Sequence, residues 1–162
     1  MSTEVRVKHT TPAVMASLDQ HIASASVLSV KYKKFHWYVS GPFFKPLHDL
    51  FDAHYDQLVE IIDDLAERSR AIGGYPVGTT REFLELSLVT DADGTLFSPL
   101  EMVELLHADT DKIIDTLHEH IELATRDNDP GTADILTSVV QIYQKQAWFL
   151  AETKARKALS EF

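Results

Sequence analysis

The stretch FHWYVSGPFFKPLHDLFD, residues 35–52, places two histidines and an aspartate around a short loop. The Ser-Gly-Pro sequence at residues 40–42 is typical of a point where a helix ends. His36 therefore falls near the end of one helical segment, whereas His48 and Asp52 fall in the next. Because the loop is short, we expect it to bring His36 back towards His48. The stretch thus predicts a helical hairpin with half of a metal-binding site at its turn.

Helical signals continue on both sides of this hairpin. Thr11-Pro12 opens the first segment, with proline at the first helical position, where its missing N–H costs nothing. Gly73-Gly74 ends the second segment, and a capping box at residues 98–101 opens the third. We expect long helices over residues 12–39, 46–72 and 98–126, and a fourth from Asp129-Pro130 to near the end of the sequence.

The connection between the second and third helices, residues 75–97, is too long for a plain turn. Its TTREFLELS sequence predicts a short helix, and LSLVT at residues 86–90 is the one run that could be read as a strand. Four long helices with one long crossover predict an all-α, ferritin-like four-helix bundle of up-down-down-up topology. We expect a flexible N-terminal tail over residues 1–10 and a single domain over residues 11–162.

Composition narrows the chemistry of any site. The chain has 162 residues, a net charge of −10 with histidine neutral, and no cysteine. A metal site must then use His, Asp and Glu, which favours iron, manganese or zinc, and the acidic charge disfavours contact with a phosphate backbone. No apolar run is long enough to cross a bilayer and no export signal is evident, so we expect a cytoplasmic location.

The second helix carries four candidate ligands on one face. His48 and Asp52 are four residues apart, and so are Asp63 and Glu67. At about 100° per residue, all four positions fall within about 100° of one another around the helix. The centres of the two pairs are nevertheless 15 residues apart, which is roughly 22 Å along the axis. One helix therefore cannot direct both pairs at one ion.

A two-fold axis would bring the pairs together. If two copies of the second helix cross antiparallel, the first pair of one copy meets the second pair of the other, and each dimer has two equivalent sites. Each site would combine two imidazoles and three carboxylates, which suit ferrous iron: His36, His48 and Asp52 of one subunit with Asp63 and Glu67 of the partner subunit. Acids at four-residue spacing are more often a solvated helix face, and spacing alone leaves that alternative open.

Two longer motifs carry a family resemblance. HWYVSGPFFKPLHDLFD reads as His-Trp-x-x-x-Gly followed by Leu-His-x-x-x-Asp, and IDDLAERSRAIGGYP reads as Asp-x-x-Ala-Glu-Arg followed by Ile-Gly-Gly and proline. Both resemble motifs of the Dps family, the dodecameric mini-ferritins, and the helix plan resembles the family over about residues 11–160. By this resemblance, five residues match the ligands of the family's intersubunit ferroxidase centre, divided between the two subunits as above: His36, His48, Asp52, Asp63 and Glu67.

The resemblance also implies a function. It implies an iron-storage and detoxification protein that oxidises Fe(II), preferably with hydrogen peroxide, and stores ferric oxide inside a hollow shell of twelve chains. We therefore expect a ferroxidase that protects DNA from oxidative damage and forms a homo-oligomeric dodecamer built from two-fold dimers. Its substrates would be Fe(II) and hydrogen peroxide, and zinc or another divalent metal could occupy the same ligands.

Further residues acquire candidate roles from the resemblance. Trp37 would donate an electron to a stray oxidant at the site, or alternatively serve as an interface or core aromatic. The family has negatively charged iron-entry pores around the start of the fourth helix, where Asp134 resembles a pore acid. Asp127 and Asp129 would add to the negative field there, because attraction of a cation depends on the summed charge. Asp129 also suits a helix N-cap.

Three more residues lie near the motifs. Arg68 and Lys34 are candidates for contacts beside the site, and an ordinary structural salt bridge is the favoured interpretation for Arg68. His54 is turned away from the ligand face of the second helix, and we expect it at the surface or at an interface.

Other functions compete with this one. A di-iron enzyme with its site inside one bundle needs two Glu-x-x-His motifs, whereas the chain has one, ending at His107, and a near miss ending at His118. A DNA-compacting structural protein is the main alternative, but twelve chains of charge −10 carry about −120, so we expect weak or no direct DNA binding. An inert interaction module is opposed only by the intact ligand set.

Overall fold

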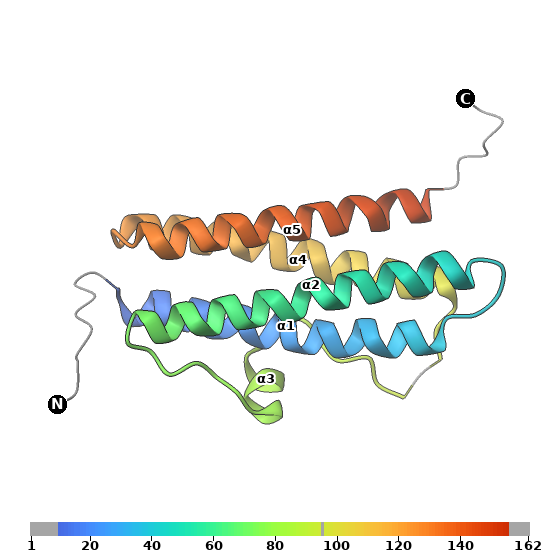
Figure 1. Cartoon of the computed structure of the whole chain (residues 1–162), viewed down its shortest axis with the longest axis horizontal. Helices are drawn as coiled ribbons and strands as arrows, with labels where there is room; N and C mark the ends of the chain where they lie inside the picture. Colours follow the sequence, from blue (N-terminus) through green and yellow to red (C-terminus); the bar gives the residue numbers. More distant parts are fainter. Residues whose placement is uncertain (1–9, 95, 156–162) are drawn as a thin grey trace.

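A computed structural model describes residues 10–94 and 96–155, and this part of the chain is entirely helical apart from turns and connections. Figure 1 shows two antiparallel hairpins of long helices packed against each other, with a short helix beside α1. The helices are α1 (Pro12–Tyr38), α2 (Phe44–Ala71), α3 (Thr80–Leu86), α4 (Pro99–Arg126) and α5 (Pro130–Lys154).

The order of helix directions is the one expected from the sequence. Helix α1 runs away from the N-terminus, α2 returns, α4 runs parallel to α2, and α5 returns (Figure 1). The long connection that contains α3 passes back along the bundle, which permits α2 and α4 to be parallel. The prediction of an all-α bundle with an up-down-down-up order and a short helix in the crossover is confirmed.

Local signals explain where the helices begin. The Thr11 side chain accepts a hydrogen bond from Val14 N at 3.4 Å, and Pro12 follows as the first helical residue. Capping boxes open α3 and α4, since Thr79 and Ser98 each exchange bonds with a glutamate three residues later.

Two details differ from the sequence expectations. Helix α2 begins at Phe44, ahead of Pro46. The early start is possible because the first N–H groups of a helix have no intrahelical acceptor, so a proline in the first turn removes no bond. Residues 86–90 contain the end of α3 and a bend, and no strand occurs among the described residues.

The core is a continuous apolar layer along all four long helices. It includes large side chains with no more than 1% exposure from each of them, among them Phe35, Phe51, Leu58, Leu117 and Tyr143. These residues repeat at three- and four-residue spacing, which places them on the inward stripe of each helix. None of the described helices is long and apolar enough to cross a membrane.

His54 belongs to this core and not to the surface. Its side chain is 2% exposed, and its Nδ1 lies 3.0 Å from the hydroxyl of Tyr32, which is also buried. The expectation of a surface or interface residue was wrong. Position 54 lies three residues after Phe51 and four before Leu58, so it falls on the inward stripe. The polar ring is accommodated because the tyrosine hydroxyl gives it a partner.

Candidate metal centre

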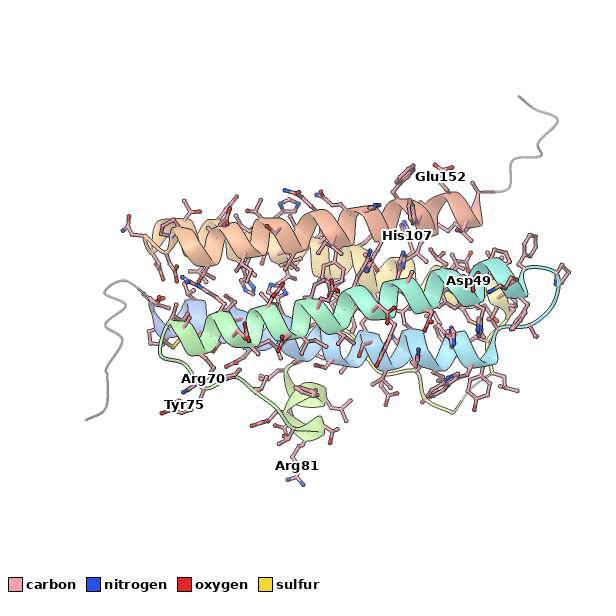
Figure 2. The ribbon with its side chains drawn as sticks, viewed as in Figure 1. Asp49, Arg70, Tyr75, Arg81, His107 and Glu152 are labelled. Atoms are coloured by element: carbon pink, nitrogen blue, oxygen red, sulfur yellow. The ribbon has the colours of Figure 1, made fainter. Side chains whose placement is uncertain are left out.

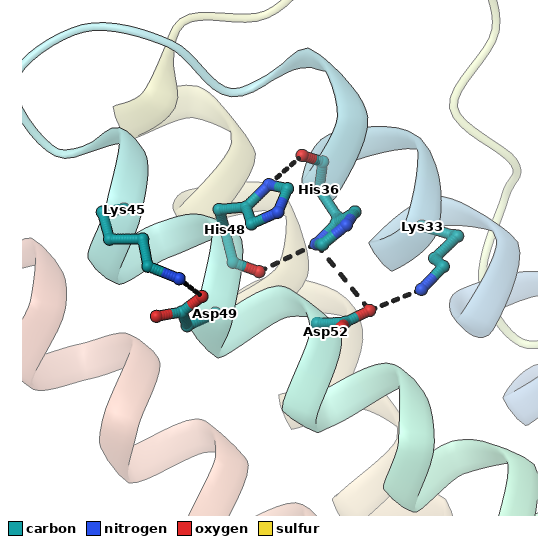
Figure 3. A network of polar contacts seen from close by, with 6 residues as sticks. All are labelled: Lys33, His36, Lys45, His48, Asp49 and Asp52. Carbon is teal, nitrogen blue, oxygen red and sulfur yellow. Dashed lines mark hydrogen bonds and ion pairs between the residues drawn. The ribbon is translucent and has the colours of Figure 1, made fainter.

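His36 and His48 lie against each other where α1 ends and α2 begins. Their rings stack with centroids 3.6 Å apart and an interplanar angle of 24°. Each ring nitrogen Nδ1 faces the backbone carbonyl of the other residue: His36 Nδ1 lies 2.8 Å from His48 O, and His48 Nδ1 lies 2.9 Å from His36 O (Figure 3). The loop at residues 39–43 thus brings the two histidines together as the sequence predicted.

These reciprocal bonds determine the protonation pattern of both rings. A carbonyl oxygen can only accept, so each Nδ1 must carry its hydrogen and donate. In a neutral ring, the lone pair is then on Nε2, which is the nitrogen available to a metal ion. A backbone carbonyl that fixes the non-coordinating nitrogen is the usual arrangement around metal-binding histidines. The donor chemistry of the two rings therefore fits a first-row divalent ion.

Asp52 completes this group from one turn further along α2. Its Oδ1 is 3.8 Å from His36 Nδ1 and also forms an ion pair with the ammonium of Lys33 (Figure 3). The hydrogen bond from Lys33 lowers the pKa of the Asp52 carboxyl below its ordinary value. The same bond raises the pKa of Lys33. We call His36, His48 and Asp52 the histidine half-site, and Lys33 is its resident counter-ion.

The sequence motifs pointed to Lys34 and not to its neighbour Lys33. Lys34 turns away, and its Nζ donates to the carbonyl oxygens of Ala92, at 2.6 Å, and of Asp93 in the long connection. Lys33 could have been identified as a neighbour of the site because it lies three residues before His36, on the same face of α1.

Asp63 and Glu67 form a second, separate group near the other end of α2. Both side chains are exposed, and neither takes part in a hydrogen bond or ion pair among the described residues. Because the two groups are roughly 22 Å apart along α2, they do not meet within one chain. The described residues of a single chain contain no group of three His, Asp or Glu side chains arranged to hold a metal ion. We call Asp63 and Glu67 the carboxylate half-site.

Trp37 follows the first histidine and is 69% exposed. It is therefore not a core aromatic within this chain, which leaves an interface or an electron-donor role. Other large apolar side chains are exposed around the same end of the bundle: Tyr38, Phe43 and Phe44.

The three predicted pore acids lie in different environments. Asp134 is exposed and lines an open depression of about 540 Å³ at the turn between α4 and α5. Asp127 is half-buried and accepts a hydrogen bond from the Thr11 hydroxyl. Asp129 is buried at 4% exposure, caps α5 through Thr132 N, and pairs with Arg68 at 2.6 Å. Its carboxylate is occupied by these contacts, so the pore prediction now depends on Asp127 and Asp134.

The contact of Arg68 is thus a structural salt bridge within the chain, as the sequence favoured. Burial alone would raise the pKa of Asp129, but hydrogen bonds from Thr132 and Thr10, together with the Arg68 charge, lower it overall. Asp129 therefore stays ionised as the partner of the guanidinium.

The histidine of the single Glu-x-x-His motif pairs with an acid one helical turn further along α4. His107 Nδ1 lies 3.0 Å from Asp111 Oδ2 on the same helix (Figure 2 labels His107). Glu104 of the motif is exposed.

Comparisons with known proteins agree with this architecture. The ferritin-like domain family matches residues 15–157. The chain is 38% identical over 138 residues to DNA protection during starvation protein 2 of Bacillus anthracis, covering 85% of this chain and 93% of that protein. The chain belongs to the Dps family.

Solved Dps structures have the same fold. Dps from Thermosynechococcus elongatus superposes with a TM-score of 0.87 at 38% identity, over 90% of this chain and 92% of that one. Dps from Listeria innocua, in a crystal soaked with zinc, superposes with a TM-score of 0.82 at 31% identity, over 86% of this chain and 94% of that one. The resemblance read from the two motifs is thereby confirmed at the level of family and fold.

Proposed function

We propose that this Dps-family chain is the subunit of an iron-storage ferroxidase. Fe(II) is its substrate, hydrogen peroxide its preferred oxidant, and ferric oxide its stored product. The observation that carries the proposal is the histidine half-site, where reciprocal backbone bonds leave the Nε2 atoms of His36 and His48 as the available donors. Such a pair, with a carboxylate beside it, suits ferrous iron better than it suits a structural role.

The complete site is formed by two subunits. The histidine half-site supplies two imidazoles and Asp52, and the carboxylate half-site of a two-fold partner supplies Asp63 and Glu67. Both acids are exposed and have no hydrogen-bond or ion-pair partner among the described residues, which favours contact with another chain. An isologous dimer brings the two ends of α2 together twice and produces two equivalent sites. Twelve such chains as six dimers would enclose the iron store, as the family resemblance implies.

The reaction requires no group beyond the two substrates. Two ferrous ions each lose one electron, and one hydrogen peroxide accepts both, so its O–O bond breaks without release of a hydroxyl radical. Water then hydrolyses the ferric ions to the oxide and releases protons. Joint removal of Fe(II) and peroxide would protect DNA without contact between protein and DNA, which fits the net charge of −10.

A complementation experiment tests the shared site. Anaerobic protein is mixed with Fe(II) and peroxide, and ferric absorbance is followed by stopped flow. His36→Ala and Asp63→Ala should each be slow on their own. In a co-assembled mixture of the two, the mixed dimer has one site with all its ligands intact, so part of the rate should return. Glu119→Ala, at an exposed acid on α4, is the matched control and should oxidise iron at the wild-type rate.

Two results would contradict the proposal. Wild-type oxidation no faster than buffer would remove the ferroxidase function and favour the DNA-compacting alternative, which a gel shift in physiological salt would then examine. Single variants as fast as the wild type would show that the oxidation happens elsewhere on the protein.

A further inference from the structure

The guanidinium of Arg68 is held firmly by residues at the start of α5. Its Nη2 donates to Asp129 Oδ1 at 2.6 Å, and its Nε donates to the Thr132 hydroxyl at 3.0 Å. A Cβ at Gly131 would lie 2.8 Å from the same Nη2, closer than any side chain could remain without moving the guanidinium. The absence of a side chain at Gly131 thus gives Arg68 its space.

Asp129 is the centre of this arrangement. Its Oδ1 also accepts from Thr132 N at 3.0 Å, and its Oδ2 accepts from the hydroxyls of Thr132 at 2.8 Å and Thr10 at 2.9 Å. The Asp129 side chain is 3% exposed, whereas that of Arg68 is 24% exposed. A buried carboxylate with four donors has little freedom to move, so it fixes the position of the more exposed cation.

The two half-sites differ in their counter-ions. In the histidine half-site, Lys33 neutralises Asp52. In the carboxylate half-site, the adjacent cation is Arg68, which directly follows Glu67 in the sequence, yet it is turned away to Asp129.

Arg70, the second arginine near the end of α2, is also engaged elsewhere. Its Nη1 donates to Gly74 O at 2.6 Å, and its guanidinium stacks on Tyr75 (Figure 2). Both arginines at the end of α2 are thus kept from the two acids.

We propose that Asp129 keeps the Arg68 guanidinium away from the carboxylate half-site, so that Asp63 and Glu67 retain their full negative charge for a divalent cation. Asp129 is then a positioning residue for metal binding, and its contribution is electrostatic. This inference rests on the proposed function, because it assumes that Asp63 and Glu67 bind metal.

The physical consequence of losing the Asp129 charge is predictable. Arginine stays protonated at all ordinary pH values and has a long, flexible stem. Asp64 lies four residues before Arg68, the spacing and order at which an acid and a base pair well on a helix surface. A released guanidinium would therefore swing to Asp64, beside Asp63, and its positive charge would oppose the approach of a metal ion.

A purely structural role for the Arg68–Asp129 pair makes a different prediction. If the pair only joins α2 to α5, any variant that breaks it should lower the free energy of unfolding and disturb metal binding through the loss of structure. Removal of both partners should then reduce Zn²⁺ affinity at least as much as removal of one. If the role is electrostatic, removal of both charges should restore metal binding although the connection between the helices is lost.

The test measures Zn²⁺ binding to the assembled protein by calorimetry at low salt, for wild type, Asp129→Asn and the double variant Asp129→Asn/Arg68→Met. Asparagine is chosen because it is isosteric and also a good N-cap. Asp129→Asn should bind Zn²⁺ about three- to tenfold more weakly, an effect that corresponds to one unscreened charge nearby and should shrink at high salt. The double variant should bind within about twofold of wild type, even if its urea midpoint is lower.

The outcomes separate this inference from the proposed function. If Asp63→Ala leaves Zn²⁺ affinity unchanged, both the proposed function and the inference are overturned. If Asp63→Ala weakens Zn²⁺ binding, two results would overturn the inference alone. One is an Asp129→Asn affinity equal to that of the wild type, and the other is a double variant that binds as weakly as Asp129→Asn. Should Asp129→Asn not fold, Asp129→Ser takes its place, because serine keeps an N-cap oxygen and removes the charge. It should likewise weaken Zn²⁺ binding, and unchanged binding there would overturn the inference.

Discussion

His36 and His48 each donate Nδ1–H to the backbone carbonyl of the other, at 2.8 and 2.9 Å. The two bonds connect the end of α1 to the beginning of α2, so the same contacts hold the hairpin and orient the two rings. The proposed metal binding and the local stability of this turn are therefore coupled. Each ring is at once a ligand candidate and part of the turn's hydrogen bonding.

Replacement of His48 by alanine tests this coupling. The variant loses one donor to the metal and leaves the His36 carbonyl without its hydrogen bond. We expect Zn²⁺ affinity to fall at least about tenfold and the free energy of unfolding to fall by about 1 kcal/mol. Calorimetry and urea unfolding measure the two quantities. His118→Ala is the control, because His118 is exposed on α4, and equal Zn²⁺ affinity in both variants would contradict the assignment.

In the proposed site, Lys33 would compete with a metal ion for Asp52, so removal of the lysine charge should strengthen metal binding. Lys33→Met keeps most of the side-chain volume but leaves Asp52 without its cation, so we expect Zn²⁺ affinity at pH 7 to rise about three- to tenfold. The pKa of Asp52 should rise towards its ordinary value, because the bond that lowers it is gone. Binding should then be lost at a higher pH on acidification than in the wild type.

Lys33→Arg is the matched control for this prediction. It retains a positive charge beside Asp52, so its Zn²⁺ affinity should stay close to that of the wild type. If Lys33→Met bound no more tightly than Lys33→Arg, the lysine would have a packing role, for which its position over the ring of Tyr55, 4.4 Å from the centroid, offers a basis.

A buried histidine pair makes the fold sensitive to acid. His21 is 2% exposed, and its Nε2 lies 2.9 Å from His120 Nδ1. Its own Nδ1 is buried and has no hydrogen-bond partner in the described part of the chain. Burial, reinforced by His120, lowers the pKa of His21 to about 3. The unfolded chain therefore binds this proton first, and the stability that the neutral ring contributes is lost as pH falls from about 6.5 towards 3.

This titration should be visible in unfolding experiments. Between pH 6.5 and 4.5 the contribution of His21 to the free energy of unfolding should fall by about 2 kcal/mol. His21→Gln should flatten the pH dependence of the urea midpoint by a corresponding amount, whereas His118→Gln, at an exposed position, should leave the slope unchanged. Parallel slopes for wild type and His21→Gln would show that other groups dominate acid unfolding, and His54, whose pKa is lowered to about 4 by burial, is the first to examine.

The bundle and the placement of His36 beside His48 could be predicted because both depend on local rules. Capping residues, glycine stops and three- and four-residue spacing decide where a helix begins, ends and turns its apolar side. The same spacing put His48 and Asp52 on one face, and the length of α2 showed that Asp63 and Glu67 lie too far away to join them within one chain. The reciprocal histidine bonds could not be predicted, since they depend on the exact path of a five-residue loop.

Buried polar contacts were the principal failure of sequence reasoning. His54 was expected at the surface or at an interface, yet it occupies a core position, and so does His21, which the sequence patterns did not single out. Asp129 was predicted both as a pore acid and as a cap. The structure gives it the cap together with a salt bridge to Arg68, a residue 61 positions away. A contact between two residues so far apart in the chain produces no spacing pattern that could be recognised in a single sequence.

Trp37 offers the last test, because its exposure leaves two roles open. An indole that is 69% exposed beside His36 can fill a subunit interface or donate an electron when peroxide is reduced by only one ferrous ion. Trp37→Phe keeps an aromatic of similar shape, so dimers should remain intact by analytical ultracentrifugation. If Trp37 is a donor, spin trapping during Fe(II) oxidation should detect several-fold more hydroxyl radical in the variant. Tyr75→Phe, an exposed aromatic at the far end of α2, should match the wild type, and equal radical yield in all three proteins would leave Trp37 with an interface role alone.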